Sequence, residues 1–226
     1  MNQCSSHPSP RAIIFDLDGL MVDSEPLAEW AWNRVLARYG HRLDSQTMLD
    51  ILGLRVVDSA RLICERFRLP ISPQQAADER DRLFLDAVPT RLRPCPGLYP
   101  LLDELADERG LPLGIATSGH RRYVTLVLRT LAIESFFQVI ATGDEVARGK
   151  PAPDIYLLAA ARLGVPPACC LVLEDAPLGV AAARAAGMVC VAVPNPRVVL
   201  RHFTEAHRIL LSLEDVRVAL DDLLSG

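Results

Sequence analysis

The first apolar segment of the chain is short and leads directly into carboxylates. Residues 12–15 read AIIF, and a continuous run of β-branched and aromatic residues favours a strand buried on both faces of a parallel sheet. Asp16 and Asp18 follow it, and Gly19 permits a sharp turn. Ligands bind beyond the carboxyl ends of strands in open α/β sheets. The segment predicts either a binding site or an Asx-type turn, because Asp and Gly serve both.

The next part of the chain shows helical periodicity only. A helix is predicted to begin at residues 24–26, with Pro26 in its first turn, and its apolar residues recur every four positions to residue 39. Two further helices are predicted at residues 56–67 and from a capping box at residue 72. No strand pattern appears between residues 24 and 88, so we expect residues 24–90 to form a helical insert, a second small domain.

Strands and helices alternate in the remainder of the chain. Strands are predicted at residues 113–117, 138–141, 171–173, 189–193 and 209–211, with helices between them. This order is typical of a doubly wound α/β fold, a parallel sheet with right-handed crossovers and helices on both faces. We therefore expect an α/β core formed by residues 11–23 and 91–226, preceded by a flexible polar tail at residues 1–10.

Composition narrows the function classes. With 50% apolar residues, 23% charged residues and a net charge of -4, the chain has the composition of a soluble globular protein. Basic residues form no patch interleaved with aromatics, and no apolar run is long enough to span a bilayer, so neither nucleic acid nor membrane is an expected partner. The cysteines and histidines lack zinc-ligand spacing. We expect a cytoplasmic monomer.

Polar side chains follow several of the predicted strands. They are Asp16, Asp18, Thr117, Ser118, Lys150, Glu174 and Asp175. Carboxylates are the hard oxygen ligands that Mg²⁺ takes, which makes Asp16, Asp18 and Asp175 candidate metal ligands. A lysine, a hydroxyl and free backbone N–H groups at a helix start suit a phosphate. Together these residues predict a site for a magnesium ion and a phosphate.

Each part of this set also has a purely structural interpretation. Residues 117–119 suit a helix N-cap, Lys150 suits a solvated loop, and residues 174–175 suit the acidic start of a helix. Their occurrence at successive strand ends favours the site, because loops at that edge build binding sites.

The motifs resemble those of the haloacid dehalogenase superfamily, in its β-phosphoglucomutase-like branch with a helical cap inserted after the first strand. The matching segments are residues 15–26 (FDLDGLMVDSEP), 116–119 (ATSG), 149–154 (GKPAPD) and 173–179 (LEDAPLG). They span nearly the whole chain. The resemblance implies a Rossmann-like core, a Mg²⁺ cofactor and a small phosphorylated substrate.

The resemblance also implies a role for each motif residue. Asp16 is the expected nucleophile that forms an aspartyl-phosphate, and Asp18 the expected acid and base. Metal ligation is implied for Asp16, Asp175 and the backbone carbonyl of Asp18, with Glu174 acting through a water. Thr117, Ser118 and Lys150 are implied phosphate ligands. The cap is expected to close over the site and select the substrate.

Positions where this sequence differs from the family pattern help to distinguish between the possible activities. Mutases of this branch carry a histidine where this chain has Ala28, and a Gly-x-Ser-Arg pattern where it reads Gly53-Leu54-Arg55-Val56. Lys150 is the only lysine, which removes a Schiff-base lysine from the cap. The pattern is similar to sugar-phosphate phosphatases. Open alternatives are a phosphosugar mutase, a nucleoside 5′-monophosphate phosphatase and a non-catalytic phosphometabolite-binding module.

Glu25, Arg55 and His120 are candidate substrate contacts near the cap and hinge. Arg55 is equally consistent with an exposed helix start, and His120 with a solvent-facing loop.

Overall fold

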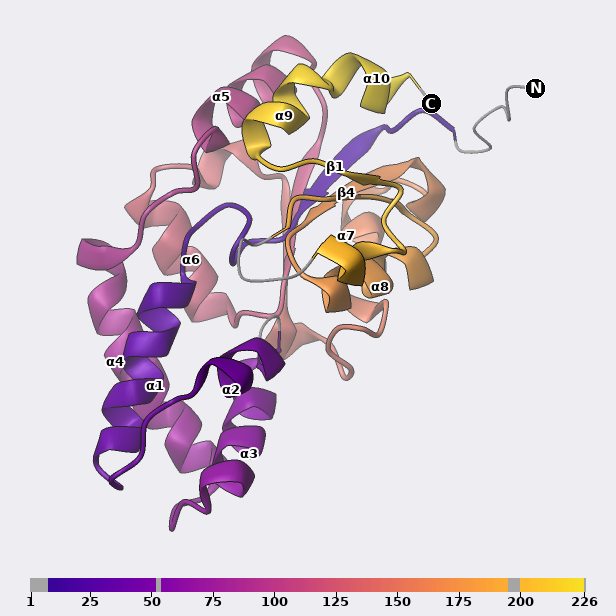
Figure 1. The fold of residues 1–226 in the computed structure, drawn as a ribbon. Coiled ribbons are helices and arrows are strands. Elements are labelled where there is room, and N and C mark those ends of the chain that lie inside the picture. The colour runs from indigo at the N-terminus through magenta and orange to yellow at the C-terminus, as the bar shows by residue number, and fades with distance from the viewer. Residues whose placement is uncertain (1–7, 52–53, 195–199, 226) are drawn as a thin grey trace.

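The computed structural model describes residues 8–51, 54–194 and 200–225. Its centre is a six-stranded parallel sheet in the order β3-β2-β1-β4-β5-β6 (Figure 1). The strands are β1 Ala12–Phe15, β2 Leu113–Thr117, β3 Val139–Thr142, β4 Cys170–Glu174, β5 Val189–Ala192 and β6 Arg208–Ile209. The order reverses at β1, which is the arrangement of a doubly wound fold. The predicted fold class is confirmed.

The register of the central strands brings the motif residues to one edge. Phe15 lies opposite Ile115 on one side and Leu173 on the other. Asp16, Thr117 and Asp175 therefore emerge together at the carboxyl edge of the sheet, where the strand reversal leaves room for a ligand.

Helices cover both faces of the sheet. One face packs on α5 Leu98–Asp103, α6 Arg121–Thr130, α9 Leu213–Val218 and α10 Leu220–Leu224, and the other on α7 Asp154–Leu163 and α8 Pro177–Ala185. Alternate residues of β1 divide between the two cores, since Ile13 and Phe15 join the first and Ala12 and Ile14 the second. This explains why β1 is apolar at every position.

A separate helical unit, the cap, lies beyond the carboxyl edge of the sheet (Figure 1). It contains α1 Glu25–Ala37, α2 Ser45–Asp50, α3 Val56–Phe67 and α4 Pro73–Arg91, packed around a core of its own that includes Trp32, Leu36 and Ile63. The short helix α2 was not predicted; it begins where the Asp44 side chain accepts a hydrogen bond from the Thr47 N–H. The assignment of residues 24–90 to the cap stays a prediction.

The chain enters and leaves the cap side by side. Asp23 N–H donates to the Arg93 carbonyl at 3.0 Å, and Cys95 N–H donates to the Met21 carbonyl at 2.8 Å. An antiparallel bridge between Val22 and Pro94 joins the same two segments. The two connections thus form a short ribbon that starts just after Asp18.

Some predicted boundaries differ from the structure. The last strand covers Arg208–Ile209 rather than residues 209–211, and between the cap and β2 the chain forms α5 followed by a π-helical turn at Glu104–Glu108. Short 3-10 turns lie at Glu134–Phe136, Gly143–Glu145, Pro167–Cys169 and Leu200–Phe203. Within the described ranges, no helix combines the length and apolar character that crossing a membrane requires. Most of the predicted tail at residues 1–10 lies outside the described residues.

Candidate active site

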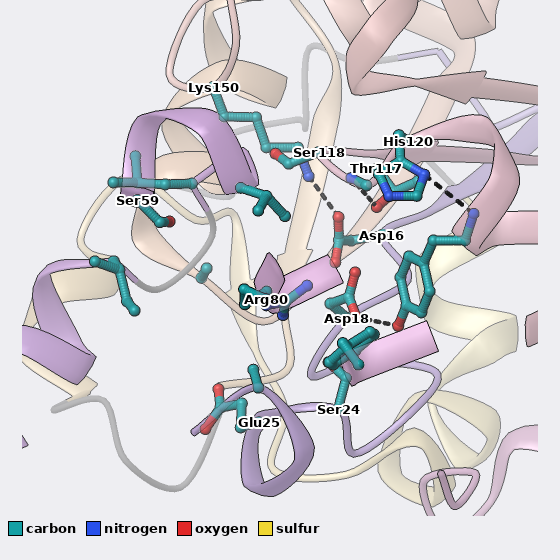
Figure 2. Close-up of a pocket in the computed structure, with 18 of the residues that line it drawn as sticks. Asp16, Asp18, Ser24, Glu25, Ser59, Arg80, Thr117, Ser118, His120 and Lys150 are labelled. Atoms are coloured by element: carbon teal, nitrogen blue, oxygen red, sulfur yellow. Dashed lines mark hydrogen bonds and ion pairs between the residues drawn. The ribbon is translucent and has the colours of Figure 1, made fainter. Parts of the chain in front are cut away.

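The strand-end residues predicted from the sequence meet in one cavity between the sheet edge and the cap (Figure 2). Its lining includes Asp16, Asp18, Thr117, Ser118, Lys150, Glu174 and Asp175. The cap contributes the opposite wall through residues of α1, α3 and α4. The structure therefore brings together every motif residue that the sequence analysis selected.

Lys150 is a buried cation between carboxylates. Its Nζ lies 2.6 Å from Asp16 Oδ1 and also donates to Glu174 Oε1, and its side chain is 3% exposed. Burial disfavours the charged ammonium, but the carboxylates of Asp16 and Glu174 outweigh burial and hold the pKa of Lys150 above its ordinary value. The interpretation of Lys150 as a solvated loop residue is wrong.

Glu174 is fixed from several directions. Oε1 accepts hydrogen bonds from Lys150 and from the Tyr156 hydroxyl at 2.7 Å, while Oε2 accepts one from Ala176 N–H at 3.0 Å. The carboxylate lies directly against Gly179 in α8, where a Cβ atom would stand 1.5 Å from Oε1. Both oxygens are thus engaged by the protein. The contact that Glu174 makes most directly with the site is its ion pair with Lys150.

The donor set fits a divalent cation. Carboxylate oxygens of Asp16, Glu174 and Asp175 lie within 4.8 Å of one another, and all of these residues are buried. Burial raises the pKa of Asp16 to about 8, with Lys150 opposing that rise. Burial, reinforced by the negative charge of Glu174, raises the pKa of Asp175 well above its usual range. A bound cation would favour the ionised form of such buried acids.

The loop after β2 lines the cavity and is held by hydrogen bonds. Thr117 Oγ1 accepts a hydrogen bond from Gly119 N–H at 3.0 Å, and Gly143 N–H donates to the Gly119 carbonyl at 2.9 Å. A Cβ atom on Gly143 would meet the Ser118 carbonyl oxygen at 2.3 Å, so the close approach of the turn after β3 to this loop needs glycine. Residues 117–119 are not the helix N-cap, because His120 occupies that position in α6.

The carboxylate of Asp18 is hydrogen-bonded to a tyrosine side chain. The Tyr123 hydroxyl donates to Asp18 Oδ1 at 2.5 Å. Figure 2 shows the Asp16 and Asp18 carboxylates facing the same space. The arrangement places a nucleophile candidate and an acid candidate together, with different neighbours: an ammonium for Asp16 and a neutral hydroxyl for Asp18.

His120 links the core to the cap. In the neutral imidazole, Nδ1 accepts the Tyr123 N–H at 3.2 Å, and Nε2 lies 2.8 Å from Asp81 Oδ2 in α4. The hydrogen bond to the Asp81 carboxylate, against a smaller opposing effect of burial, raises the pKa of His120. His120 lines the cavity, and the interpretation as a solvent-facing loop residue is wrong because its polar atoms are engaged with α6 and the cap.

The other candidate cap residues have different positions. Glu25 is buried and lines the cavity. Arg55 does not appear in that lining among the described residues; its Nε binds Asp58 at 2.7 Å, and its side chain lies against Gly149. Gly53, the other end of the quoted cap segment, lies outside the described residues.

Several residues of the site were not selected from the sequence: Arg80, Tyr123, Tyr156 and Gly179. Arg80 in α4 lines the cavity with its guanidinium 3.9 Å from the Phe84 ring, and its Nε is buried without a hydrogen-bond partner among the described residues. A glycine inside a helix pattern signals close packing, so Gly179 was detectable. The others were not, because tertiary contacts alone bring them to the site.

The comparisons with known proteins agree with this geometry. The family model of the haloacid dehalogenase-like hydrolases matches residues 10–187. The chain is 35% identical over 212 residues to a probable pseudouridine-5'-phosphatase of Drosophila melanogaster, covering 90% of each chain. It is 36% identical to the fructose-1-phosphate phosphatase YqaB of Escherichia coli, over 80% of this chain and 95% of that one.

A solved structure supports the same assignment. The phosphate complex of CbbY from Rhodobacter sphaeroides superposes with a TM-score of 0.81 at 29% identity, covering 90% of this chain and 95% of that chain. This protein belongs to the haloacid dehalogenase-like hydrolases. Within that family it is an enzyme of the phosphoric monoester hydrolase class.

Proposed function

We propose that the protein is a Mg²⁺-dependent phosphatase that hydrolyses a small sugar or polyol phosphate through an aspartyl-phosphate on Asp16, as a cytoplasmic monomer. The observation that carries the proposal is the position of Asp16: it lies at the end of β1, paired with the buried Lys150, in a cavity that also holds Asp18 and Asp175. A buried carboxylate with a fixed cation beside it is suited to attack phosphorus while the charges of the phosphoryl oxygens are neutralised.

Each residue has a distinct task in this proposal. An oxygen of Asp16 forms a bond to phosphorus as the bond to the leaving oxygen breaks, and Asp18 gives that oxygen a proton. Water then attacks the aspartyl-phosphate, Asp18 takes a proton from the water, and inorganic phosphate and free Asp16 result. Thr117, the Ser118 N–H and Lys150 bind the phosphoryl oxygens throughout.

The acidic cluster at the sheet edge is the proposed binding site of the metal. Asp16, Asp175 and the Asp18 carbonyl are the proposed ligands, and a role of Glu174 through a water stays a prediction. When bound, Mg²⁺ would supply positive charge to the phosphoryl oxygens. Glu174 acts on the same site through Lys150, whose ammonium it orients.

Relatives support sugar or polyol phosphates as the substrate class. One is the fructose-1-phosphate phosphatase above, and another, 35% identical, is a (DL)-glycerol-3-phosphatase of Arabidopsis thaliana. A second candidate is a nucleoside 5′-monophosphate, because Trp32, Met48 and Phe84 make the cap wall of the cavity largely apolar and would suit the faces of a base. The Drosophila relative is named for a substrate of that kind.

The first experiment is hydrolysis of p-nitrophenyl phosphate with Mg²⁺. We expect turnover that EDTA abolishes and added Mg²⁺ restores, and that Asp16→Asn removes. An Asp154→Asn variant, whose carboxylate pairs with Arg148 on the surface, serves as the control and should retain activity. Absence of turnover, or turnover indifferent to EDTA or Asp16→Asn, would refute the proposal. A screen of sugar, polyol and nucleoside phosphates, ranked by kcat/KM, then decides between the two substrate classes.

A further inference from the structure

Tyr123 lies next to Asp18, the proposed acid of the reaction, in a position to orient its carboxyl group. It is in the first turn of α6, directly after the loop at residues 117–119, and is 5% exposed. Its hydroxyl lies 2.5 Å from Asp18 Oδ1, although Asp18 is 105 residues away along the chain. This short hydrogen bond occupies one carboxylate oxygen of Asp18 and leaves Oδ2 for proton transfer.

The tyrosine ring is held on several sides. Its edge meets the ring of Phe84 in the cap helix α4, with centroids 5.2 Å apart and planes at 68°. A Cβ atom at Gly119 would stand 2.9 Å from Tyr123 Cδ1, so the glycine makes room for the ring. Ser24, at the start of α1, lines the same cavity as Tyr123. Because its neighbours come from the loop and the cap, the hydroxyl has a fixed position.

The direction of the hydrogen bond follows from the chemistry of the two groups. The Asp18 oxygen accepts, and a tyrosine hydroxyl, whose ordinary pKa is about 10, carries a proton to donate. The phenol therefore keeps its proton across the working pH range. It is a permanent donor to Asp18 and does not compete with it for the proton that the reaction moves.

We propose that Tyr123 is a positioning residue that holds the Asp18 carboxyl group in the orientation needed to protonate the leaving oxygen. The proposal rests on the acid role of Asp18 proposed above. Asp18 lies in the turn just after β1, and a carboxyl group in a turn has more than one rotamer available. The Tyr123 hydrogen bond selects one of them. Since the ring of Phe84 in the cap helix α4 packs against the tyrosine, the acid is aligned while the cap is in contact with the core.

The test uses Tyr123→Phe and two substrates of the same shape, p-nitrophenyl phosphate and phenyl phosphate. Nitrophenolate leaves with little help from an acid, whereas phenolate needs the proton more. Because kcat/KM reports the steps up to phosphoryl transfer, we expect the variant to lose about 10- to 100-fold in kcat/KM on phenyl phosphate, and less than about 3-fold on p-nitrophenyl phosphate. The retained activity on the second substrate also shows that the variant folds.

Controls separate positioning from a structural role. Tyr99→Phe also removes one tyrosine hydrogen bond, from its hydroxyl to the Leu131 carbonyl at 3.2 Å, and should change neither substrate. Asp18→Asn should show the same dependence on leaving group as Tyr123→Phe, and the double variant should lose no more than Asp18→Asn alone. Equal losses on both substrates, no loss on either, or additive losses in the double variant would overturn the proposal for Tyr123. If Asp18→Asn itself is indifferent to the leaving group, the proposed acid role of Asp18 has failed instead.

Discussion

Replacing Gly179 by Ala has two opposing effects on the stability of the protein, and the two differ in size. Gly179 is the third residue of α8, and helix propensity favours alanine over glycine by at most about 1 kcal/mol, the value for a helix interior. On helix propensity alone, the variant should be more stable than the parent. The structure predicts the reverse, because a Cβ atom at this position would lie 1.5 Å from Glu174 Oε1 and 1.9 Å from Cδ.

The magnitude follows from the contacts that Glu174 must give up. It would have to leave the Lys150 ammonium, the Tyr156 hydroxyl and the Ala176 N–H together. Breaking a buried ion pair costs about 3–5 kcal/mol. Subtracting the propensity gain leaves a net loss of about 2–4 kcal/mol in the free energy of unfolding. Lys150 would also lose one of its two carboxylate partners, and a displaced phosphate ligand is expected to lower kcat/KM by about 100-fold.

Urea denaturation followed by circular dichroism measures the first quantity, and hydrolysis of p-nitrophenyl phosphate the second. Gly164→Ala is the matched control: Gly164 ends α7 with a φ of 67° and open space where a Cβ would lie, so it should cost about 1 kcal/mol in stability with unchanged kcat/KM. A Gly179→Ala protein that equals or exceeds the parent in stability with full activity would refute the reasoning.

Three further predictions address the metal, the cap contact and the reaction type. Saturating Mg²⁺, at about 100 times its Kd, should stabilise the protein against thermal denaturation by about 2.7 kcal/mol. Asp175→Asn should abolish this stabilisation by Mg²⁺, whereas Asp154→Asn should keep it. Equal stabilisation of both variants would contradict the assignment of the site. The Asp81 hydrogen bond raises the pKa of His120, against burial and the nearby Arg80, with Asp144 adding to the rise. The pKa of Asp81 is lowered, because the His120 hydrogen bond and Arg80 together outweigh burial. The His120 contribution to stability is therefore complete below its unfolded-state pKa of about 6.5 and is lost as pH rises through the folded pKa, whereas that of Asp81 is complete above about 3.8 and is lost as pH falls through its folded pKa. His120→Asn, which keeps an N-cap, should accordingly reduce the free energy of unfolding more at pH 5.5 than at pH 9, and a pH-independent difference would count against the pair. Finally, Ala28 lines the cavity where a mutase of this branch has histidine, so β-glucose 1-phosphate should be hydrolysed faster than it is converted to glucose 6-phosphate; a coupled assay giving comparable rates would restore the mutase alternative.

The sheet and its functional edge were largely predictable because their signals are local. A strand buried on both faces of a parallel sheet is apolar along its length, as β1 is and as β4 is up to Glu174, and the carboxylates at the ends of such strands must share an edge. The helices α1, α3 and α4 were predictable from their periodicity and from the lack of any strand pattern around them.

The residues that hold the catalytic side chains in place could not be predicted from the sequence, and the reason is physical. Tyr123 and Tyr156 have the spacing of ordinary core residues on α6 and α7, and nothing local distinguishes a buried phenol that binds a catalytic carboxylate from one that only packs. His120 illustrates the same limit, since its partner Asp81 is on a helix of the other domain. The ends of weak elements, such as β6, were misplaced because pairing with β5 sets them rather than their own apolar pattern.

The paired connections at Met21 and Cys95 have a consequence for how such an enzyme can diversify. The chain leaves the core and returns to it at neighbouring points that are hydrogen-bonded to each other, so the core presents the same two anchors whatever is spliced between them. Lengthening or exchanging the inserted helices changes the closure entropy only slowly with length and displaces no strand. The chemistry at the sheet edge and the choice of substrate are therefore separable parts, able to change independently over evolutionary time.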